Sequence, residues 1–496
     1  MVAAQAELIE RLTARVAELE RRLGLDSSNS SRPPSSDPPW SKKPAKPRSS
    51  RERSGRKPGK QPGDPGVSRS LSDTPDRVVR IEPGHCSGCT RSLTGALATV
   101  SERRQVVDLP PVPAPVITEY QLLCKTCVCC GAVTTADWTA ADDVNAQVVA
   151  PAGSPVRIGP RALAMCALLT CGHYLPVGRA TALLETLTGL HLATGFTARA
   201  RRRAAKKLTA TFLPHMKDLL ATAPMLHADE TTGRAAGALA YVHVACTEYL
   251  TLLHVGGRSS NDIDNGGVLT DFTGVLVRDG YAGYDHLPAI HAWCGAHLIR
   301  DLRSVSDADP AGQLWATAMA DTLTAANQAA CQARSEGRDR LDPDTLATVI
   351  NHYLGALAKG TTDNLGQTGE LAGKARTLIR RFRRYQDMIL RFATDLSVSW
   401  TNNQAERDVR PVKIQQRTSG GCWRTLQGLT EFAVVHSYLA TAHKWGKRQI
   451  PGPHRTLHHR PLATTSTRPQ LNSYECHNRR TRACSPAGWQ RGVGPR

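Results

Sequence analysis

Residues 225–232, MLHADETT, and residues 274–284, GVLVRDGYAGY, decide the fold. MLHADETT is a short apolar run with Asp229 at its end, and GVLVRDGYAGY has the pattern of a buried strand that ends in Asp279. Between them, YVHVACT and YLTLLHV are rich in β-branched and aromatic residues and predict two further strands. We therefore expect a mixed sheet that holds carboxylates rigidly at strand ends and leaves them at the surface.

A third acid follows a long helical stretch. Residues from about 300 to 395 carry Ala-rich and Arg-rich patterns, such as KARTLIRRFRRYQDMILRF, that predict helices. WTNNQAERDVRPVK then opens another helix, on which Asn403, Glu406, Arg407 and Arg410 are three or four positions apart and share one face. An acid flanked by cations is suited to lie beside both a metal ion and a phosphate backbone.

Three acids from distant positions in the sequence are suited to phosphodiester chemistry. Two-metal phosphoryl transfer needs hard oxygen ligands that hold two divalent ions about 3.5–4 Å apart. Mg²⁺ fits such a site, because it takes a few carboxylates and keeps waters that the substrate can replace. Taken alone this signal is weak, since most of the 43 acidic residues are expected to be solvated.

Together these motifs resemble the catalytic domain of the insertion-sequence-66 family of transposases. The similarity runs through HADETT, GVLVRDGYAGY, HAWCGAHLIRDL and WTNNQAERDVRPVK with SGG after it, and it covers residues 27–446. It implies an α/β catalytic domain over residues 223–446, with an RNase H-like fold and the helical stretch as an insertion before the last acid. Matched motif by motif, the catalytic and metal-binding acids of the DDE set are Asp229, Asp279 and Glu406.

The resemblance also implies a reaction and its partners. A DDE transposase uses two Mg²⁺ ions, for which Mn²⁺ can substitute, to cut double-stranded DNA at the terminal inverted repeats of its element and to join the ends to target DNA. We expect a homo-oligomer that works with accessory proteins of the same element. Arg407, Arg410 and Lys413 are expected to hold DNA phosphates.

Three further residues are expected to support the active site. Cys294 and His297 form a C-x-x-H pair that matches the family pattern, and Asn403 shares a helix face with Glu406. The pair could position the active site or contact DNA. A packed core pair is favoured over a metal site, because only two ligands are evident.

Two other functions stay open. A nuclease of the same fold would share the three acids and hydrolyse DNA without joining it, and a decayed transposase would bind DNA without chemistry. Three departures from the family bear on this choice. Tyr241 stands where a tryptophan is expected, the loop RSSNDIDNGG is more polar than usual, and the tail over residues 447–496 has no helical or strand period. We expect that basic tail to be disordered.

The charge of the chain favours a polyanionic partner. The formal net charge is +20, with 63 Lys and Arg residues against 43 acids, which points to nucleic acid. The sequence contains no run of about 18 apolar residues, the length that would predict a membrane span. The first segment, MVAAQAELIERLTARVAELE, carries acids and lacks the apolar core of a signal peptide. We therefore expect a cytoplasmic protein.

The first 75 residues predict a helix and a linker. Over residues 1–25, apolar side chains step by three and four positions, as in the seam of a short coiled coil, although a solvated amphipathic helix is nearly as well supported. Residues 26–75 are basic and rich in Pro, Ser and Gly, with little to bury, and they predict disorder. Such a linker could hold DNA through its phosphates or serve only as a spacer.

Six cysteines lie within residues 76–145, among short extended stretches. Zinc takes four thiolates or imidazoles in a tetrahedron, and CxxC pairs in a chain without a secretion signal favour metal ligation over disulfides. We predict a zinc-ribbon-like module in which a structural Zn²⁺ replaces a hydrophobic core, with incidental thiols as the alternative. The favoured ligands are Cys86, Cys89, Cys127 and Cys130, and Cys124 or Cys129 could replace one of them.

Residues 155–222 predict a helical region that resembles a helix-turn-helix. PVGRATALLETLTGL and TGFTARARRRAAKKL are typical of two helices with a break at Gly189, and the second is strongly basic. Its cations would mostly meet phosphates, because consecutive positions cannot all face one groove. The predicted DNA contacts are Arg201, Arg202, Arg203 and Lys206, with a solvated basic helix as the alternative.

Overall fold

The computed structural model describes residues 11–13, 15–16, 69–137 and 156–446. The chain divides into two units, one of residues 39–114 and the other of the remainder. This boundary falls inside the zinc-ribbon-like module predicted over residues 76–145. Most of the predicted coiled coil and basic linker, and the whole of the predicted C-terminal tail, lie outside the described residues.

The smaller unit has little regular structure in its described part, residues 69–114. A tight turn there begins at Cys86, whose N–H donates to the carbonyl of Arg91 at 2.9 Å, and His85 forms an isolated bridge with Ser92. The extended stretches expected from the sequence form no strand ladder in this part of the chain. Apolar side chains such as Ile81 are almost fully exposed, so no core orders them.

A short hairpin in the larger unit carries the second group of cysteines. β1 (Cys124–Thr126) pairs antiparallel with β2 (Val133–Thr135). At its tip the Cys127 N–H donates to the carbonyl of Ala132 at 2.8 Å, and Gly131 has a φ of +73°. A positive φ favours glycine, and this turn brings Cys127 and Cys130 together.

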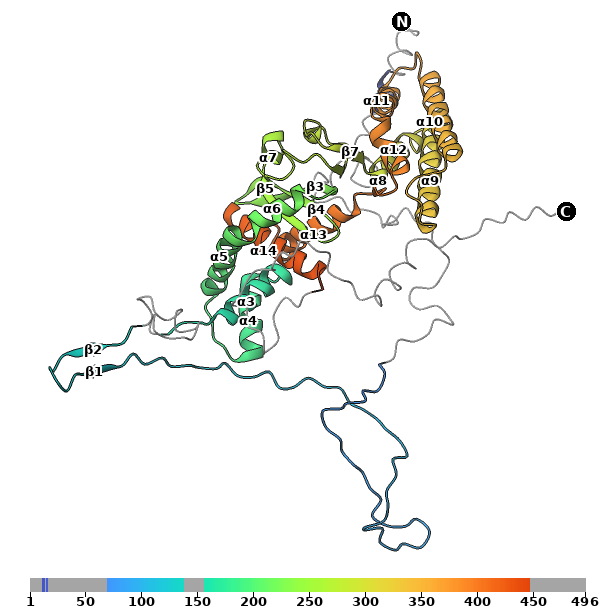
Figure 1. The fold of residues 1–496 in the computed structure, drawn as a ribbon. Coiled ribbons are helices and arrows are strands. Elements are labelled where there is room, and N and C mark those ends of the chain that lie inside the picture. Colours follow the sequence, from blue (N-terminus) through green and yellow to red (C-terminus); the bar gives the residue numbers. More distant parts are fainter. Residues whose placement is uncertain (1–10, 14, 17–68, 138–155, 447–496) are drawn as a thin grey trace. The chain divides into compact units, whose positions relative to one another are not determined.

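The region that the sequence predicts to be catalytic is built on a five-stranded mixed sheet (Figure 1). Its strands are β3 (Met225–Ala235), β4 (Ala238–Cys246), β5 (Thr251–Gly256), β6 (Val275–Arg278) and β7 (Ile290–Trp293). They lie in the order β5-β4-β3-β6-β7, with antiparallel pairing among the first three and parallel pairing of β3 with β6 and of β6 with β7. This mixed sheet is consistent with the RNase H-like core expected from the sequence.

Helices cover both faces of the sheet, because its strands alternate between two cores. Val242 and Val244 of β4 pack in one core with α13 (Asn403–Thr418) and α14 (Leu426–Lys444). Ala245, one residue along β4, packs in the other core with α6 (Leu213–Ala221). This period of two is the signature of a strand that is buried on both sides.

The region predicted to bind DNA packs against the same sheet domain. It consists of α3 (Pro160–Ala167), the π-helical turn Leu168–Gly172, α4 (Val177–Thr188) and α5 (Thr194–Thr211), followed by α6. α4 ends at Gly189, which has a φ of +70°, as the sequence indicated. Cys171 and Ala205 are buried in the core that α13 and α14 share with the sheet. The basic helix α5 is therefore part of the same packed unit as the sheet.

The helical insertion has its own core. It comprises α8 (Gly295–Ser306), α9 (Leu314–Ser335), α10 (Pro343–Asp363), α11 (Glu370–Arg384) and α12 (Gln386–Thr394), which gather together in Figure 1. Trp315, Tyr353 and Phe382 are fully buried in it. Gly360 allows the close approach of α10 to α9, because a Cβ there would lie 2.6 Å from the Trp315 ring. No helix of the described residues is long and apolar enough to cross a membrane.

Candidate active site

The two predicted aspartates lie on neighbouring strands, β3 and β6, that pair in parallel. Asp279 follows the end of its strand as predicted, but Asp229 lies inside β3, because β3 continues to Ala235 through its pairing with β4. Both side chains are half-buried. The Glu230 N–H donates to Asp229 Oδ1 at 2.8 Å, and the Tyr281 N–H donates to Asp279 Oδ1 at 2.9 Å. Burial, and next the charge of Asp279, raise the pKa of Asp229 to about 8. The two carboxyl groups are therefore close enough to oppose each other's ionisation, an arrangement that a cation would relieve.

The third predicted acid, Glu406, lies in the first turn of α13. One carboxylate oxygen of Glu406, a ring nitrogen of His297 and the Cys294 Sγ all lie within 4.8 Å of one another. His297 also interacts electrostatically with both Asp229 and Asp279. His297 thus interacts with all three acids, although they are distant in sequence.

The C-x-x-H pair holds the start of the insertion beside these acids. Cys294 is buried and caps α8, and His297 lies in the first turn of that helix. Burial lowers the pKa of His297, but the hydrogen bond and charge of Cys294 and the charge of Asp279 outweigh it, so the pKa is raised. The sequence favoured a packed core pair because it offered only two ligands. In the structure Glu406 adds a third ligand atom to the group.

The helix that carries Glu406 is fixed to the sheet at both ends of its first two turns. Asn402 Nδ2 donates to the Ala228 carbonyl at 2.7 Å, and the Asn402 N–H donates to Cys294 Sγ at 3.1 Å. Further along, Thr251 Oγ1 of β5 donates to Asp408 Oδ2 at 2.7 Å. Asn403, the predicted supporting residue, has an exposed side chain, and its buried neighbour Asn402 makes the contacts. The pattern of two asparagines was visible in the sequence, but not which one faces the sheet.

A buried arginine that the sequence analysis missed organises the loop of Asp279. Arg278 is 0% exposed. Its Nη1 donates to the carbonyls of Asp279 and Tyr281 at 3.1 and 3.0 Å, its Nη2 to Asp285 Oδ1 at 2.5 Å, and its Nε to His291 Nδ1 at 2.9 Å. An arginine at the end of an apolar run is normally expected to be solvated, so only the tertiary partners reveal this role.

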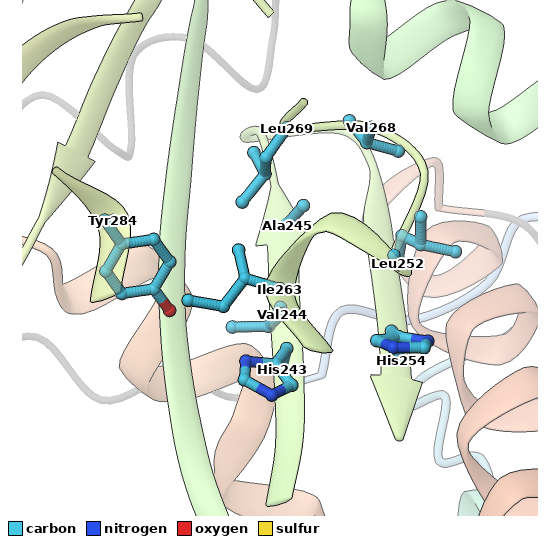
Figure 2. Close-up of a pocket in the computed structure, with 10 residues that line it drawn as sticks. His243, Val244, Ala245, Leu252, His254, Ile263, Val268, Leu269 and Tyr284 are labelled. Carbon is cyan, nitrogen blue, oxygen red and sulfur yellow. The ribbon is translucent and has the colours of Figure 1, made fainter. Parts of the chain in front are cut away.

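A small cavity beside β4 and β5 is not lined by the three acids. Figure 2 shows this cavity of about 20 Å³, with His243 and His254 on the neighbouring strands β4 and β5 and the ring of Tyr284 beside them. A cavity of this size holds about one water molecule. A second, open pocket of about 400 Å³ lies between α9 and α10. Neither of these two pockets is lined by Asp229, Asp279 or Glu406.

Comparison with known protein families identifies the family of this chain. The model of the "Transposase IS66 family" matches residues 155–430, which is more than half of the chain and includes all three acids. The chain belongs to the IS66 transposase family. Residues 2–70 match a second model, described as a "Family of unknown function (DUF6444)". A search of curated proteins found no match.

Two of the cations predicted to contact DNA in this transposase are paired with an acid inside the fold. Arg201 Nε and Arg202 Nε, both on α5, donate to the two carboxylate oxygens of Glu431 at 3.2 and 2.9 Å. Glu431, on α14, is buried, and the Arg201 side chain is only 17% exposed. The side chains of Arg203 and Lys206 are exposed. Arg202 is also 63% exposed despite its pairing, so a phosphate can reach Arg202, Arg203 and Lys206 but not Arg201.

The cations on α13 divide in the same way. Arg407 and Arg410 are exposed, and Arg407 donates to the side chain of Gln404 at 2.9 Å. Lys413 instead donates to the carbonyl and the hydroxyl of Thr232 in β3. Burial, and next the neighbouring cations, lower the pKa of Lys413. Lys413 therefore binds α13 to β3, a use that competes with the predicted DNA contact.

The two arginines Arg201 and Arg203 should respond differently to substitution. Arg201→Gln is expected to lower the free energy of unfolding by about 1–2 kcal/mol, because buried Glu431 loses one of its two cationic partners. Arg203→Gln should change it by less than about 0.5 kcal/mol and should weaken DNA binding instead. Urea unfolding and DNA titration of both variants measure these effects. If Arg201→Gln leaves stability unchanged and weakens DNA binding, Arg201 contacts DNA as the sequence predicted.

The predicted zinc ligands form two local pairs. Hydrogen bonds from the backbone of Cys89 and Gly88, and from the Cys89 side chain, lower the pKa of the Cys86 thiol. The Cys127 pKa is lowered in the same way by Cys130 and Cys129. Lowered thiol pKa values suit metal ligation, since the thiolate is the ligand. The pairs belong to different units, and the zinc quartet stays a prediction.

Proposed function

We propose that the chain is a DDE transposase that cuts the ends of its own element and joins them to target DNA. The observation that carries this proposal is that three carboxylates, one in β3, one just after β6 and one in α13, all interact with His297 in a chain of a transposase family. We propose Asp229, Asp279 and Glu406 as the catalytic acids. The protein would act as a homo-oligomer on double-stranded DNA.

The residues at this site fit a pair of divalent ions. The carboxyl oxygens of Asp229, Asp279 and Glu406 are hard ligands of the kind that Mg²⁺ and Mn²⁺ take. The mutual opposition of Asp229 and Asp279 to ionisation supports the same assignment, because only a cation lets both stay charged at neutral pH. When bound, such ions supply Lewis-acid activation of water and stabilise charge at the reacting phosphate.

The chain's own residues would position the DNA and the acids. Asn402 and Arg278 hold Glu406 and Asp279 in place through their backbone contacts. Arg407 and Arg410, exposed on the helix that bears Glu406, would bind phosphates along the strand that reaches the acids. His297, with its raised pKa, adds positive charge next to the acids and would offset repulsion between them and the DNA.

The test is product analysis with the full chain. The purified protein is incubated with Mg²⁺ and a labelled duplex of the DNA that flanks its gene, beside samples with a chelator and samples in which Mn²⁺ replaces Mg²⁺. We expect both cut and joined products with either ion and none with the chelator. Products that persist in the chelator would contradict the metal-dependent mechanism.

The two alternatives give other products. A nuclease would yield cut DNA and no joined strands, and a decayed transposase would bind the duplex without either product. The same incubation, run with and without an extract of cells that carry the intact element, also tests the need for accessory proteins. Joined products that appear only with the extract would support a transposase that depends on a partner.

A further inference from the structure

An arginine that the predicted DNA contacts do not include lies between the loops of the two aspartates. Arg258 follows β5, and its Nε and Nη2 both donate to Glu230 Oε1 at 3.0 and 2.8 Å. Glu230, the residue after Asp229, has a side chain that is 5% exposed, and its other oxygen accepts from Tyr284 Oη at 2.8 Å. The carboxylate of Glu230 is thus engaged on both oxygens and acts as a support for Arg258.

The guanidinium of Arg258 is also stacked on aromatic rings. Its central carbon lies 4.0 Å from the centroid of the Tyr281 ring and 5.6 Å from that of Tyr241. Tyr281 Oη donates to the Arg258 carbonyl at 2.6 Å, while the Tyr281 N–H donates to Asp279. Arg258 is therefore tied to Asp229 through Glu230 and to Asp279 through Tyr281.

Hydrogen bonds and close packing also fix the backbone on either side of Arg258. His243 Nε2, which Figure 2 shows at the cavity, lies 2.7 Å from the Gly257 carbonyl, the residue before Arg258. On the other side Ser259 caps the short helix α7 (Ser260–Asp264) and exchanges hydrogen bonds with Asp262. Gly257 packs so closely on Asp262 that a Cβ would lie 2.5 Å from its Oδ2. Arg258 is thus preorganised before any ligand arrives.

We propose that Arg258 binds a phosphodiester of the DNA strand that enters the active site and that Glu230 is its positioning residue. The Arg258 side chain is 40% exposed, and no contact with Nη1 is present among the described residues. Arginine presents five N–H donors in a rigid fork that matches phosphate geometry, so a guanidinium held by its Nε edge keeps donors for a phosphate. The inference rests on the proposed function, because it places DNA at the three acids.

Salt-dependent binding by the full chain tests the contact without any chemistry. The affinity for the labelled flanking duplex is measured over a series of KCl concentrations in the absence of divalent ions. For Arg258→Met we expect roughly tenfold weaker binding and a slope of log affinity against log salt that is smaller by about one, the value for a lost phosphate contact. Arg258→Lys should keep the slope, because it keeps the charge, and should bind more weakly than the wild type because it lacks the fork.

Two further variants separate this contact from a structural role. Arg258→Met alone leaves Glu230 buried without its partner, so the double variant with Glu230→Gln removes both charges and guards against misfolding. Arg338→Met is the matched control, because Arg338 is exposed to a similar extent and pairs with Glu336 in the insertion. The slope should fall in the double variant and stay at the wild-type value in the control.

The outcomes for Arg258 and for the proposed function are distinguishable. A slope that stays at the wild-type value in both Arg258→Met and the double variant overturns the phosphate contact, even where DNA is cut and joined. A slope that falls by about one supports the contact, even where no product forms in the cleavage assay. In that second case Arg258 remains a DNA-binding residue, and the catalytic proposal fails if the cell extract also yields no product.

Discussion

Asp229→Asn is expected to lower the rate of DNA cleavage by about a thousandfold or more. Lewis-acid stabilisation by a bound metal ion contributes several kcal/mol to the transition state, and each 1.36 kcal/mol is a factor of about ten in rate. The substitution keeps the size of the side chain and leaves an oxygen for the Glu230 N–H, so the fold should persist. Gel analysis of the cleaved duplex measures the rate, and DNA affinity should be nearly unchanged.

Asp229→Asn should increase the stability of the folded protein at high pH, although it lowers activity. Because the pKa of Asp229 is raised to about 8, the folded protein keeps a proton there that the unfolded chain releases near pH 4. Without divalent ions, stability is therefore lost as pH rises from about 4 through 8. The amide that replaces the carboxyl group has no such proton to release. Asp229→Asn should therefore be more stable than the wild type above pH 8, by on the order of 2 kcal/mol after allowance for solvent screening.

In the presence of divalent ions the wild type should instead be more stable than Asp229→Asn. Mg²⁺ binds the folded wild type and raises its melting temperature, whereas Asp229→Asn should gain little. Asp271→Asn, which alters an exposed acid on the loop before β6, is the matched control and should behave as the wild type in every assay. Equal stabilisation of wild type and Asp229→Asn by Mg²⁺ would remove Asp229 from the metal site.

The sequence predicted which acids the fold brings together better than it predicted their surroundings. The apolar runs before Asp229 and Asp279 have the periodicity of strands, and the polar face of α13 includes Glu406, so local patterns and family motifs predicted three acids that the structure places in electrostatic or close contact with His297. Whether Asn402 or Asn403 supports the site depends on how α13 is rotated against β3. That rotation is set by tertiary packing. The helical pattern of the sequence does not determine it, because Asn402 and Asn403 lie at the very start of the helix.

The roles of the cations could not be predicted for a different reason. Arg201 and Glu431 are 230 residues apart in the chain, so no local pattern reveals that they pair. Lys413 looks like one more cation on a basic helix face until β3 brings Thr232 to it. A run of cations indicates a nucleic-acid partner for the whole chain, but each side chain is assigned only when its neighbours in space are known.

Arg278→Met is expected to lower both stability and the activity of the molecules that remain folded. The variant leaves His291 Nδ1 and the carbonyls of Asp279 and Tyr281 without their donor, and removing one member of a buried ion pair costs about 3–5 kcal/mol. We expect the lower end of that range, near 3 kcal/mol, because the side chain of Asp285 is 39% exposed and water can solvate it. Urea unfolding measures this loss.

The effect on activity follows from the contact with Asp279. Arg278 holds the carbonyls on both sides of Gly280, and a shift of about 1 Å in a reacting group can lower a rate by about a hundredfold. Arg334→Met is the control, because Arg334 also donates to backbone carbonyls, those of Leu396 and Val398 just after the insertion. It should destabilise the fold and leave the cleavage rate per folded molecule unchanged. If Arg278→Met does the same, Arg278 stabilises the sheet edge without positioning Asp279, and the alignment of the two aspartates must come from the strands alone.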